Sequence, residues 1–229
     1  MIENILDLKN KLLINKMKPI LYSFKRCPYA MRARMIIALA DISCELREVK
    51  LSNKPKHMLE VSPKGTVPVL IYKDKIIDES IEIINWVLER NNVFVNISSE
   101  QEILTENLID IFDNKFKENL DKYKYSTRYE NIDKYEHREE CIKILRKIEY
   151  QIIGEWFFGN AVNKLDICIF PFIRQFRIAD PEWFDSLIDI PKVQNLLNKF
   201  LDYEIFKIAM KKYTIWEEDS NPVYFPKAL

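Results

Sequence analysis

The chain has 229 residues, of which 48% are hydrophobic, enough to bury the core of one large domain or two small ones. Its 35 basic and 35 acidic residues cancel, so no net field attracts nucleic acid or an anionic membrane, and we expect neither as a partner. Four cysteines without metal-ligand spacing exclude a disulfide scaffold and favour a reducing cytosol, and three glycines are too few for a phosphate loop or a dinucleotide fingerprint.

Residues 1–18 show a loose amphipathic helical pattern that begins with acidic residues, where a secretory signal would carry basic ones. We interpret this segment as an N-terminal helical appendage. It either packs on the body of the protein or frays, and contact with a partner chain is the open alternative. No stretch is apolar over the length needed to cross a bilayer, so we expect a cytoplasmic protein.

A cysteine stands where an extended apolar segment, Ile20 to Phe24, gives way to a helical pattern that begins at Pro28. A thiol at a helix N-terminus faces free backbone N–H groups and the positive end of the helix dipole, which favour the thiolate. Lys25 and Arg26 add positive charge beside it. Cys27 is therefore a candidate nucleophile whose pKa we expect below that of a free thiol. The alternative is a buried structural cysteine.

Ala30 occupies the position where a disulfide oxidoreductase would carry its second cysteine. No sulfur one turn away can attack a mixed disulfide, so an external thiol must complete any exchange. The remaining cysteines lie in apolar patterns, and we expect them in the core: Cys44, Cys141 and Cys168.

The rest of the first domain alternates between extended and helical periods and ends in a hairpin and a helix. This order predicts a compact α/β domain over residues 19–95 with a small mixed sheet, because a parallel pair is followed by an antiparallel hairpin. The predicted segments after the first helix are extended Cys44–Leu51, helical His57–Val61, strands Val69–Tyr72 and Ile76–Ile77, and a helix from Glu79 to about Asn91.

Residues 96–229 carry no convincing strand signal, and we predict an all-helical second domain. The segment 125–137 is either an ordered excursion or a loop. Asn163, three residues before Asp166 and an apolar run, indicates an N-cap followed by a first-turn acid at a buried helix start.

Two short motifs in the first domain indicate a ligand site. Val67-Pro68 leads directly into a strand, and a cis bond there would leave the backbone of Val67 free to pair with an extended peptide, although an ordinary trans proline is the alternative. Asp78-Glu79-Ser80 opens a helix, where Ser80 can hold a carboxylate and Glu79 an ammonium. A carboxylate and an ammonium on one carbon are the groups of a free γ-glutamyl end. The alternative is a helix cap that binds no ligand.

Taken in order, Cys27-Pro28-Tyr29-Ala30, Thr66-Val67-Pro68 and Asp78-Glu79-Ser80, followed by a helical domain, resemble a cytosolic glutathione transferase of the cysteine-type, omega-like branch, over about 200 residues from Ile20 onward. The resemblance implies a thioredoxin-like domain with a mixed four-stranded sheet, then an all-α domain. Where the family usually caps the buried helix with Ser or Thr, this chain has Asn163.

The resemblance also implies a site. Cys27 would form a mixed disulfide with glutathione, and Lys54 fits the family's contact to the glycine carboxylate, with a solvated surface lysine as the alternative. The glutathione-binding residues would be Tyr29, Lys54, Val67, Pro68, Glu79 and Ser80. Aromatic and basic residues of the helical domain are candidates for a second-substrate pocket, or belong to its core: Tyr123, Tyr125, Phe170, Phe172, Arg174 and Trp183.

A cysteine in place of the Tyr or Ser of other branches favours a glutathione-dependent thiol transferase that acts by deglutathionylation or thiol–disulfide exchange, with glutathione as co-substrate and no metal or nucleotide. The expected partners are glutathione, a small-molecule or protein thiol, and a second copy of the chain in a homodimer. Two alternatives stay open: a glutathione-binding regulatory or scaffold module without turnover, and a conventional conjugating transferase.

Overall fold

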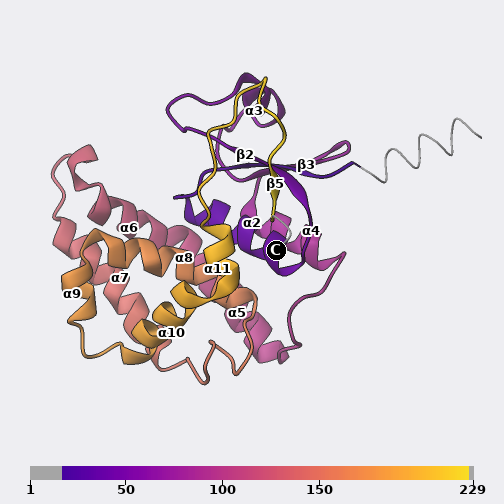
Figure 1. Cartoon of the computed structure of the whole chain (residues 1–229). Coiled ribbons are helices and arrows are strands. Elements are labelled where there is room, and N and C mark those ends of the chain that lie inside the picture. The colour runs from indigo at the N-terminus through magenta and orange to yellow at the C-terminus, as the bar shows by residue number, and fades with distance from the viewer. Residues whose placement is uncertain (1–16, 227–229) are drawn as a thin grey trace, which may run out of the picture. The chain divides into compact units, whose positions relative to one another are not determined.

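The computed structural model describes residues 17–226, so the predicted N-terminal appendage lies almost wholly outside the described residues (Figure 1). The chain divides into two compact units. The first contains the described residues up to Asn92 together with those from Ile208 onward, and the second contains Val93–Lys207. In the described part of the chain, no helix combines the length and apolar character needed to cross a bilayer.

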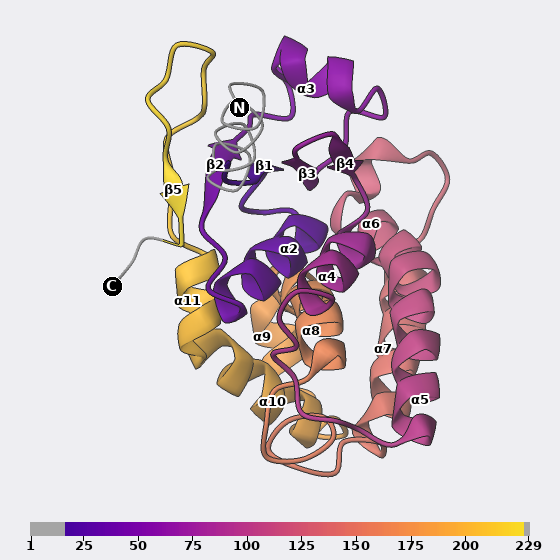
Figure 2. The same cartoon turned by 90° about the vertical axis from the view of Figure 1, so that its right-hand side faces the viewer.

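The first unit is a mixed sheet with helices on both faces. Its strands run in the order β4-β3-β1-β2-β5, with β1 parallel to β2 and the other pairs antiparallel. Figures 1 and 2 show α2 and α4 on one face and α3 on the other. The elements are β1 (Ile20–Ser23), α2 (Pro28–Leu39), β2 (Cys44–Glu48), α3 (Lys56–Val61), β3 (Val69–Tyr72), β4 (Lys75–Ile77), α4 (Ser80–Leu88) and β5 (Tyr224–Phe225).

The predicted fold class, an α/β thioredoxin-like unit with a mixed sheet and a helical unit, is confirmed. The alternation of β2 explains its place in the sheet. Cys44, Leu46 and Glu48 are buried on one side, while the residues between them are half-buried. The face under α3 is an apolar cluster built around Tyr22, Val49, Met58, Val67 and Val69.

A fifth strand is the main difference from the sequence prediction. β5 pairs with the edge of β2, placing Phe225 opposite Cys44. Residues 208–226 therefore belong to the first unit, whereas the sequence analysis assigned 96–229 to one helical domain. A two-residue strand carries no periodic signal, and its attachment rests on distant contacts such as the packing of Tyr213 on Phe225, 6.2 Å between ring centroids.

The second unit is helical from Ser99 onward. Its aromatic core joins a π-helical segment to the long buried helix α8, with Phe116 and Phe176 in edge contact at 5.7 Å. The undecided segment 125–137 contains one short 3₁₀ turn and then the start of α7. The elements are α5 (Ser99–Ile111), η1 (π-helical, Phe112–Phe116), α6 (Lys117–Lys124), η2 (3₁₀, Ser126–Arg128), α7 (Lys134–Glu149), α8 (Lys164–Ala179), α9 (Pro181–Asp185), α10 (Pro191–Asp202) and α11 (Glu204–Ala209), which crosses the boundary between the units.

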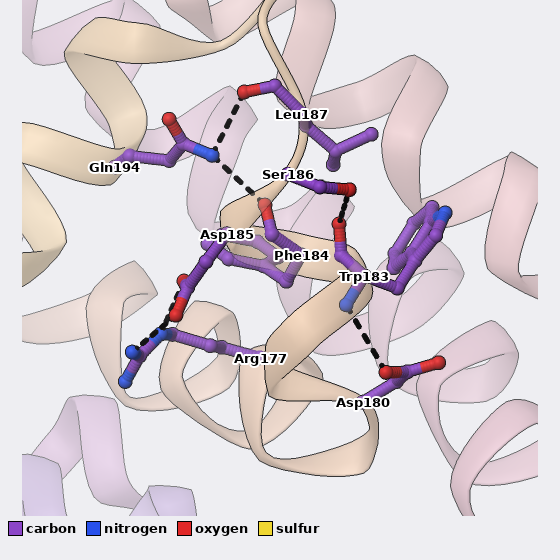
Figure 3. A network of polar contacts seen from close by, with 8 residues as sticks. All are labelled: Arg177, Asp180, Trp183, Phe184, Asp185, Ser186, Leu187 and Gln194. Carbon is purple, nitrogen blue, oxygen red and sulfur yellow. Dashed lines mark hydrogen bonds and ion pairs between the residues drawn. The ribbon is translucent and has the colours of Figure 1, made fainter.

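The short helix α9 is held by polar contacts at both ends (Figure 3). Asp180 caps it by accepting a hydrogen bond from the N–H of Trp183 at 3.2 Å. Arg177 donates two hydrogen bonds to the Asp185 carboxylate, at 2.7 and 2.6 Å. Gln194 of α10 donates to the carbonyls of Phe184 and Leu187 at 2.8 and 3.0 Å. The cap thus satisfies an N–H group at the start of α9, and Gln194 satisfies carbonyl groups at and just beyond its end.

The predicted cap of α8 is confirmed as a reciprocal capping box. The Asn163 side chain accepts hydrogen bonds from the N–H groups of Leu165 and Asp166, at 2.8 and 3.4 Å. Asp166 in turn accepts from the N–H groups of Asn163 and Phe157, at 2.9 and 3.0 Å, although it is fully buried. The pair thus satisfies four backbone donors at a buried helix start.

Removing this cap should cost stability. We expect Asn163→Ala to lower the free energy of unfolding by about 1 kcal/mol, because two buried N–H groups lose their acceptor. Asn163→Ser, which restores an oxygen acceptor, should remain within a few tenths of a kcal/mol of the wild type. Urea unfolding of the three proteins measures both values. Equal stability of the alanine variant and the wild type would contradict this role.

The buried acid also predicts a dependence on pH. Burial raises the pKa of the Asp166 carboxyl to about 7, opposed by its hydrogen bonds from Asn163 and Phe157. The unfolded chain loses the same proton near pH 4. Because the folded state binds more protons between about pH 4 and 7, this group's contribution to stability falls as the pH rises through that window and is constant above it.

We therefore expect the stability of the wild type relative to Asp166→Asn, which cannot titrate, to decline between pH 5 and pH 7. Urea unfolding at several pH values measures the difference. A difference that grows with pH would show that the carboxylate is instead stabilised by its hydrogen bonds.

Candidate functional site

Cys27 is the N-cap residue of α2, directly before Pro28 at the first helical position. A tight turn brings the chain there from β1, closed by the hydrogen bond from the Cys27 N–H to the Phe24 carbonyl at 2.9 Å. The thiol is half-buried, and its Sγ donates to the carbonyl oxygen of Val67 at 3.6 Å. The structure thus brings together two of the predicted site residues from segments 40 positions apart in the chain.

The other three cysteines are buried, as the sequence predicts. Burial raises the pKa of the Cys44 thiol to about 12, and burial likewise raises that of Cys141. Such thiols stay protonated at neutral pH and react poorly. Among residues 17–226, no group of three or more His, Cys, Asp or Glu residues could hold a metal ion.

The Val67–Pro68 bond is cis, which confirms that prediction. The approach to it bends at Gly65, whose φ of +62° suits a residue without a β carbon. The ammonium nitrogen of Lys54 lies 3.3 Å from the point that a β carbon on Gly65 would occupy. A basic group therefore stands beside the segment that ends in Val67.

The start of α4 lies against the same loop. The Ser62 hydroxyl donates a hydrogen bond to the Asp78 carboxylate at 2.8 Å. Lys64 forms a hydrogen-bonded ion pair with Glu79, and this hydrogen bond raises the pKa of Lys64. Glu79 is the N-cap residue of α4 and remains exposed. The start of α4 is therefore tied to residues 62 and 64, which stand just before the Thr66-Val67-Pro68 segment.

Ser80 is more enclosed than the sequence analysis indicated. It is 3% exposed, and its hydroxyl accepts a hydrogen bond from Nη1 of Arg32 at 3.3 Å. Arg32 lies on the helix that starts at Cys27, and its guanidinium also stands 5.3 Å from the ring centroid of Tyr29. Arg32 thus joins the thiol helix to the start of α4 and to another predicted site residue.

Two arginines of α2, Arg32 and Arg34, are fully buried and were not predicted as part of the site. The signal was available, because both interrupt the apolar run between Met31 and Ala38 of α2, where a surface helix would alternate its faces. A charged residue in such a run needs a buried partner. The partners themselves come from distant segments and have no local pattern.

The proposed second-substrate residues all lie in the second unit and are not alike. Phe172 is fully buried and in edge contact with Phe112, and Tyr123 is 6% exposed, with burial raising the pKa of its hydroxyl. Tyr125 is exposed beneath the guanidinium of Arg128, 4.3 Å from its ring centroid. Burial lowers the pKa of Arg174, which stands over the ring of Phe206.

Phe172 and Tyr123 thus belong to the helical core, while Tyr125 is accessible. Phe170 is likewise buried, and Trp183 packs on Phe176.

Known proteins resemble the part of the chain that holds Cys27, the cis proline and the start of α4. Residues 21–93 match the family model described as "Glutathione S-transferase, N-terminal domain". The "Probable glutathione transferase" of Aplysia californica is 44% identical over 57 residues, which cover 25% of this chain and 62% of that protein. "Glutathione S-transferase omega-1" of Rattus norvegicus is 26% identical over 180 residues, covering 76% and 72%.

Solved structures show the same fold at low identity. The Tau class glutathione S-transferase of mango superposes with a TM-score of 0.74 at 22% identity, covering 85% of this chain and 93% of that one. A glutathione transferase family member from Pseudomonas fluorescens pf-5, solved with two glutathione bound, gives a TM-score of 0.73 at 18% identity, covering 84% and 92%.

The family model ends where the first unit's continuous part ends, at the boundary near Asn92, and it contains the thiol, the cis proline and the start of α4. Several of the matching relatives are named as glutathione S-transferases, and they align through both units. Residues 21–93 are therefore similar to the N-terminal domain of glutathione S-transferases, and the longer alignments extend the similarity to enzymes of this family over both units.

Proposed function

We propose that this protein is a glutathione-dependent thiol transferase of the cysteine-type, omega-like branch, with Cys27 as its single nucleophile. One observation carries the proposal. Cys27 is the one half-buried thiol among four, and it stands at a helix N-terminus where the thiolate is favoured, while the other three are enclosed. A transferase that activates glutathione with a hydroxyl group would need no thiol at this position.

The residues around Cys27 fit the chemistry of a tripeptide with two acidic ends. The Val67 backbone would pair with the cysteinyl unit, which brings the glutathione sulfur close to Sγ of Cys27. Lys54 would meet the glycine carboxylate, and Ser80 with the free N–H groups of α4 would meet the γ-glutamyl carboxylate. Glu79 would exchange its surface ion pair with Lys64 for the α-ammonium.

Tyr29 and Pro68 complete the proposed glutathione site, and the fold neighbour solved with glutathione supports the choice of co-substrate. An accessible disulfide substrate would be a small molecule or a protein, and Tyr125 is the candidate for contact with it that stays exposed. A homodimer and a cytoplasmic location belong to the same proposal.

The reaction proceeds by two exchanges. The Cys27 thiolate attacks the glutathione sulfur of a glutathionylated substrate, the old S–S bond breaks, and the substrate leaves as a thiolate that takes a proton from solvent. A second glutathione, as thiolate, then attacks the glutathione sulfur held on Cys27. It leaves as glutathione disulfide and restores the Cys27 thiolate. Because Ala30 stands where a resolving cysteine would be, the second step requires external glutathione.

Substitution of the nucleophile separates the possible activities. We expect Cys27→Ala and Cys27→Ser to abolish the reduction of a mixed glutathione disulfide, because neither supplies a thiolate. The assay runs in parallel with conjugation of glutathione to a chromogenic halide. Conjugation that survives or improves in Cys27→Ser would identify a conjugating transferase. Tight glutathione binding without either activity would identify a binding module.

The thiol's environment predicts its ionisation. We expect the alkylation rate of Cys27 to rise with pH about a midpoint below that of a free thiol near 8.5, because the N-terminus of α2 stabilises the thiolate. Iodoacetamide labelling across pH 5 to 10, followed on the Cys27 peptide, gives the midpoint. A midpoint at the free-thiol value would count against an activated nucleophile.

The proposed carboxylate contact has a matched control two residues away. We expect Lys54→Ala to weaken glutathione binding about fivefold to tenfold, which is the usual size of one charge-assisted hydrogen bond at a partly exposed site. Lys56, whose side chain is 84% exposed, pairs with Glu60 on its own helix, so Lys56→Ala should leave binding unchanged within twofold. Calorimetric titration with glutathione compares them. Equal effects would mean that Lys54 contributes only general charge.

A further inference from the structure

A buried ion pair lies behind the segment that carries the proposed nucleophile. Arg34 of α2 is fully buried and Glu48 at the end of β2 is 6% exposed, and Nη2 of the arginine contacts Oε2 of the glutamate. Burial lowers the pKa of Arg34, and the neighbouring Glu48 carboxylate opposes that shift. Two charges are kept out of water here, so each must be satisfied by its neighbours.

The second oxygen of this glutamate reaches the turn before the thiol. Oε1 of Glu48 accepts a hydrogen bond from the N–H of Lys25 at 2.8 Å. Lys25 is the second residue of the turn that the Cys27 N–H closes onto the Phe24 carbonyl. The carboxylate thus holds the backbone two residues before Cys27.

Arg34 fastens the start of the same turn. Its Nε donates to the hydroxyl of Ser23 at 2.8 Å, and the Ser23 carbonyl accepts the N–H of Val49 at 2.8 Å. The chain entering the turn is therefore fixed by Arg34 and by the sheet, and the turn itself is fixed by Glu48.

The C-terminal segment closes this arrangement from the other side. Nη1 of Arg34 donates to the Ala209 carbonyl at 3.1 Å, and the ring centroid of Tyr213 lies 5.8 Å from the guanidinium carbon. The N–H of Trp216 donates to the Glu48 carbonyl at 2.8 Å. Residues 208–226 therefore hold both members of the ion pair.

We propose that Glu48 is a positioning residue for Cys27, held in place by Arg34 and the C-terminal segment. The effect of Glu48 on turnover rests on the proposed function, whereas its effect on the position of the Cys27 thiol does not. By fixing the N–H of Lys25, Glu48 keeps the Phe24–Cys27 turn in the conformation that places Sγ at the N-terminus of α2. The C-terminal segment thereby contributes to a site from which it is distant in sequence.

Position and charge predict opposite effects at this site. If Glu48 acted only through its negative charge, removing that charge beside Arg34 would favour the thiolate and lower the midpoint of Cys27 alkylation. If Glu48 acts by holding the turn, its removal lets the thiol move from the helix N-terminus and raises the midpoint. The direction of the shift distinguishes the two.

The test compares three variants of the full chain by iodoacetamide labelling of Cys27 against pH. We expect Glu48→Ala to raise the midpoint by about half a unit or more, the value of a helix-terminus interaction. Glu48→Gln keeps an oxygen that can accept the Lys25 N–H, so it should return most of the way to the wild type. Glu45→Gln is the control, since Glu45 pairs with Arg47 on the opposite face of the same strand and should change nothing. A lowered or unchanged midpoint in Glu48→Ala overturns the proposal.

Glu48→Ala leaves a buried arginine without its partner, so a second measurement uses the folded wild type. The Lys25 amide should exchange with solvent deuterium at least about tenfold more slowly than an unbonded loop amide, because its N–H is engaged. Exchange at the unprotected rate overturns the proposal whether or not the variant folds. Both measurements use the protein without substrate. A protein without transferase activity would therefore still give the same alkylation midpoint and amide exchange, so failure of the proposed function can be distinguished from failure of this proposal.

Discussion

The contact between the Cys27 thiol and the Val67 carbonyl joins the two local features on which the site depends. One is the strand-to-helix turn that leaves a thiol at the N-terminus of α2, and the other is the cis proline segment that enters β3. Each is a short-range consequence of sequence, whereas their meeting is a consequence of the sheet, in which β1 and β3 are antiparallel neighbours. The sheet thereby holds the Cys27 thiol beside the backbone of Val67.

Charged side chains are buried near this contact. Arg32 and Arg34 of the thiol helix are both fully buried, and they reach Ser80 and Glu48 respectively. A buried ion pair is weak evidence for stability, since apolar side chains of the same volume often serve better. Its directional bonds are better suited to fixing the geometry of a turn. The buried arginines therefore help to fix the position of the half-buried Cys27 thiol.

Local chemistry explains which parts were predictable from sequence. The turn before Cys27 and the reciprocal cap at Asn163 and Asp166 follow from residues within a few positions of each other, whereas the cis bond at Pro68 was favoured over trans only together with the cysteine motif. Strand β5 could not be predicted, because two residues carry no period and its partner is about 180 positions away. The partners of the buried arginines were missed for the same reason. Ser80 was correctly placed at a helix start, but its enclosure by Arg32 depends on tertiary packing.

Intact mass spectrometry after incubation with glutathione disulfide tests most directly the claim that one ionised, reachable thiol defines this protein's chemistry. We expect a single glutathionyl adduct per chain, carried by the Cys27 peptide and released by free glutathione, with Cys44, Cys141 and Cys168 unmodified. A folded protein that takes up no adduct, or that carries it on one of the buried cysteines, would show that Cys27 is not the reactive thiol.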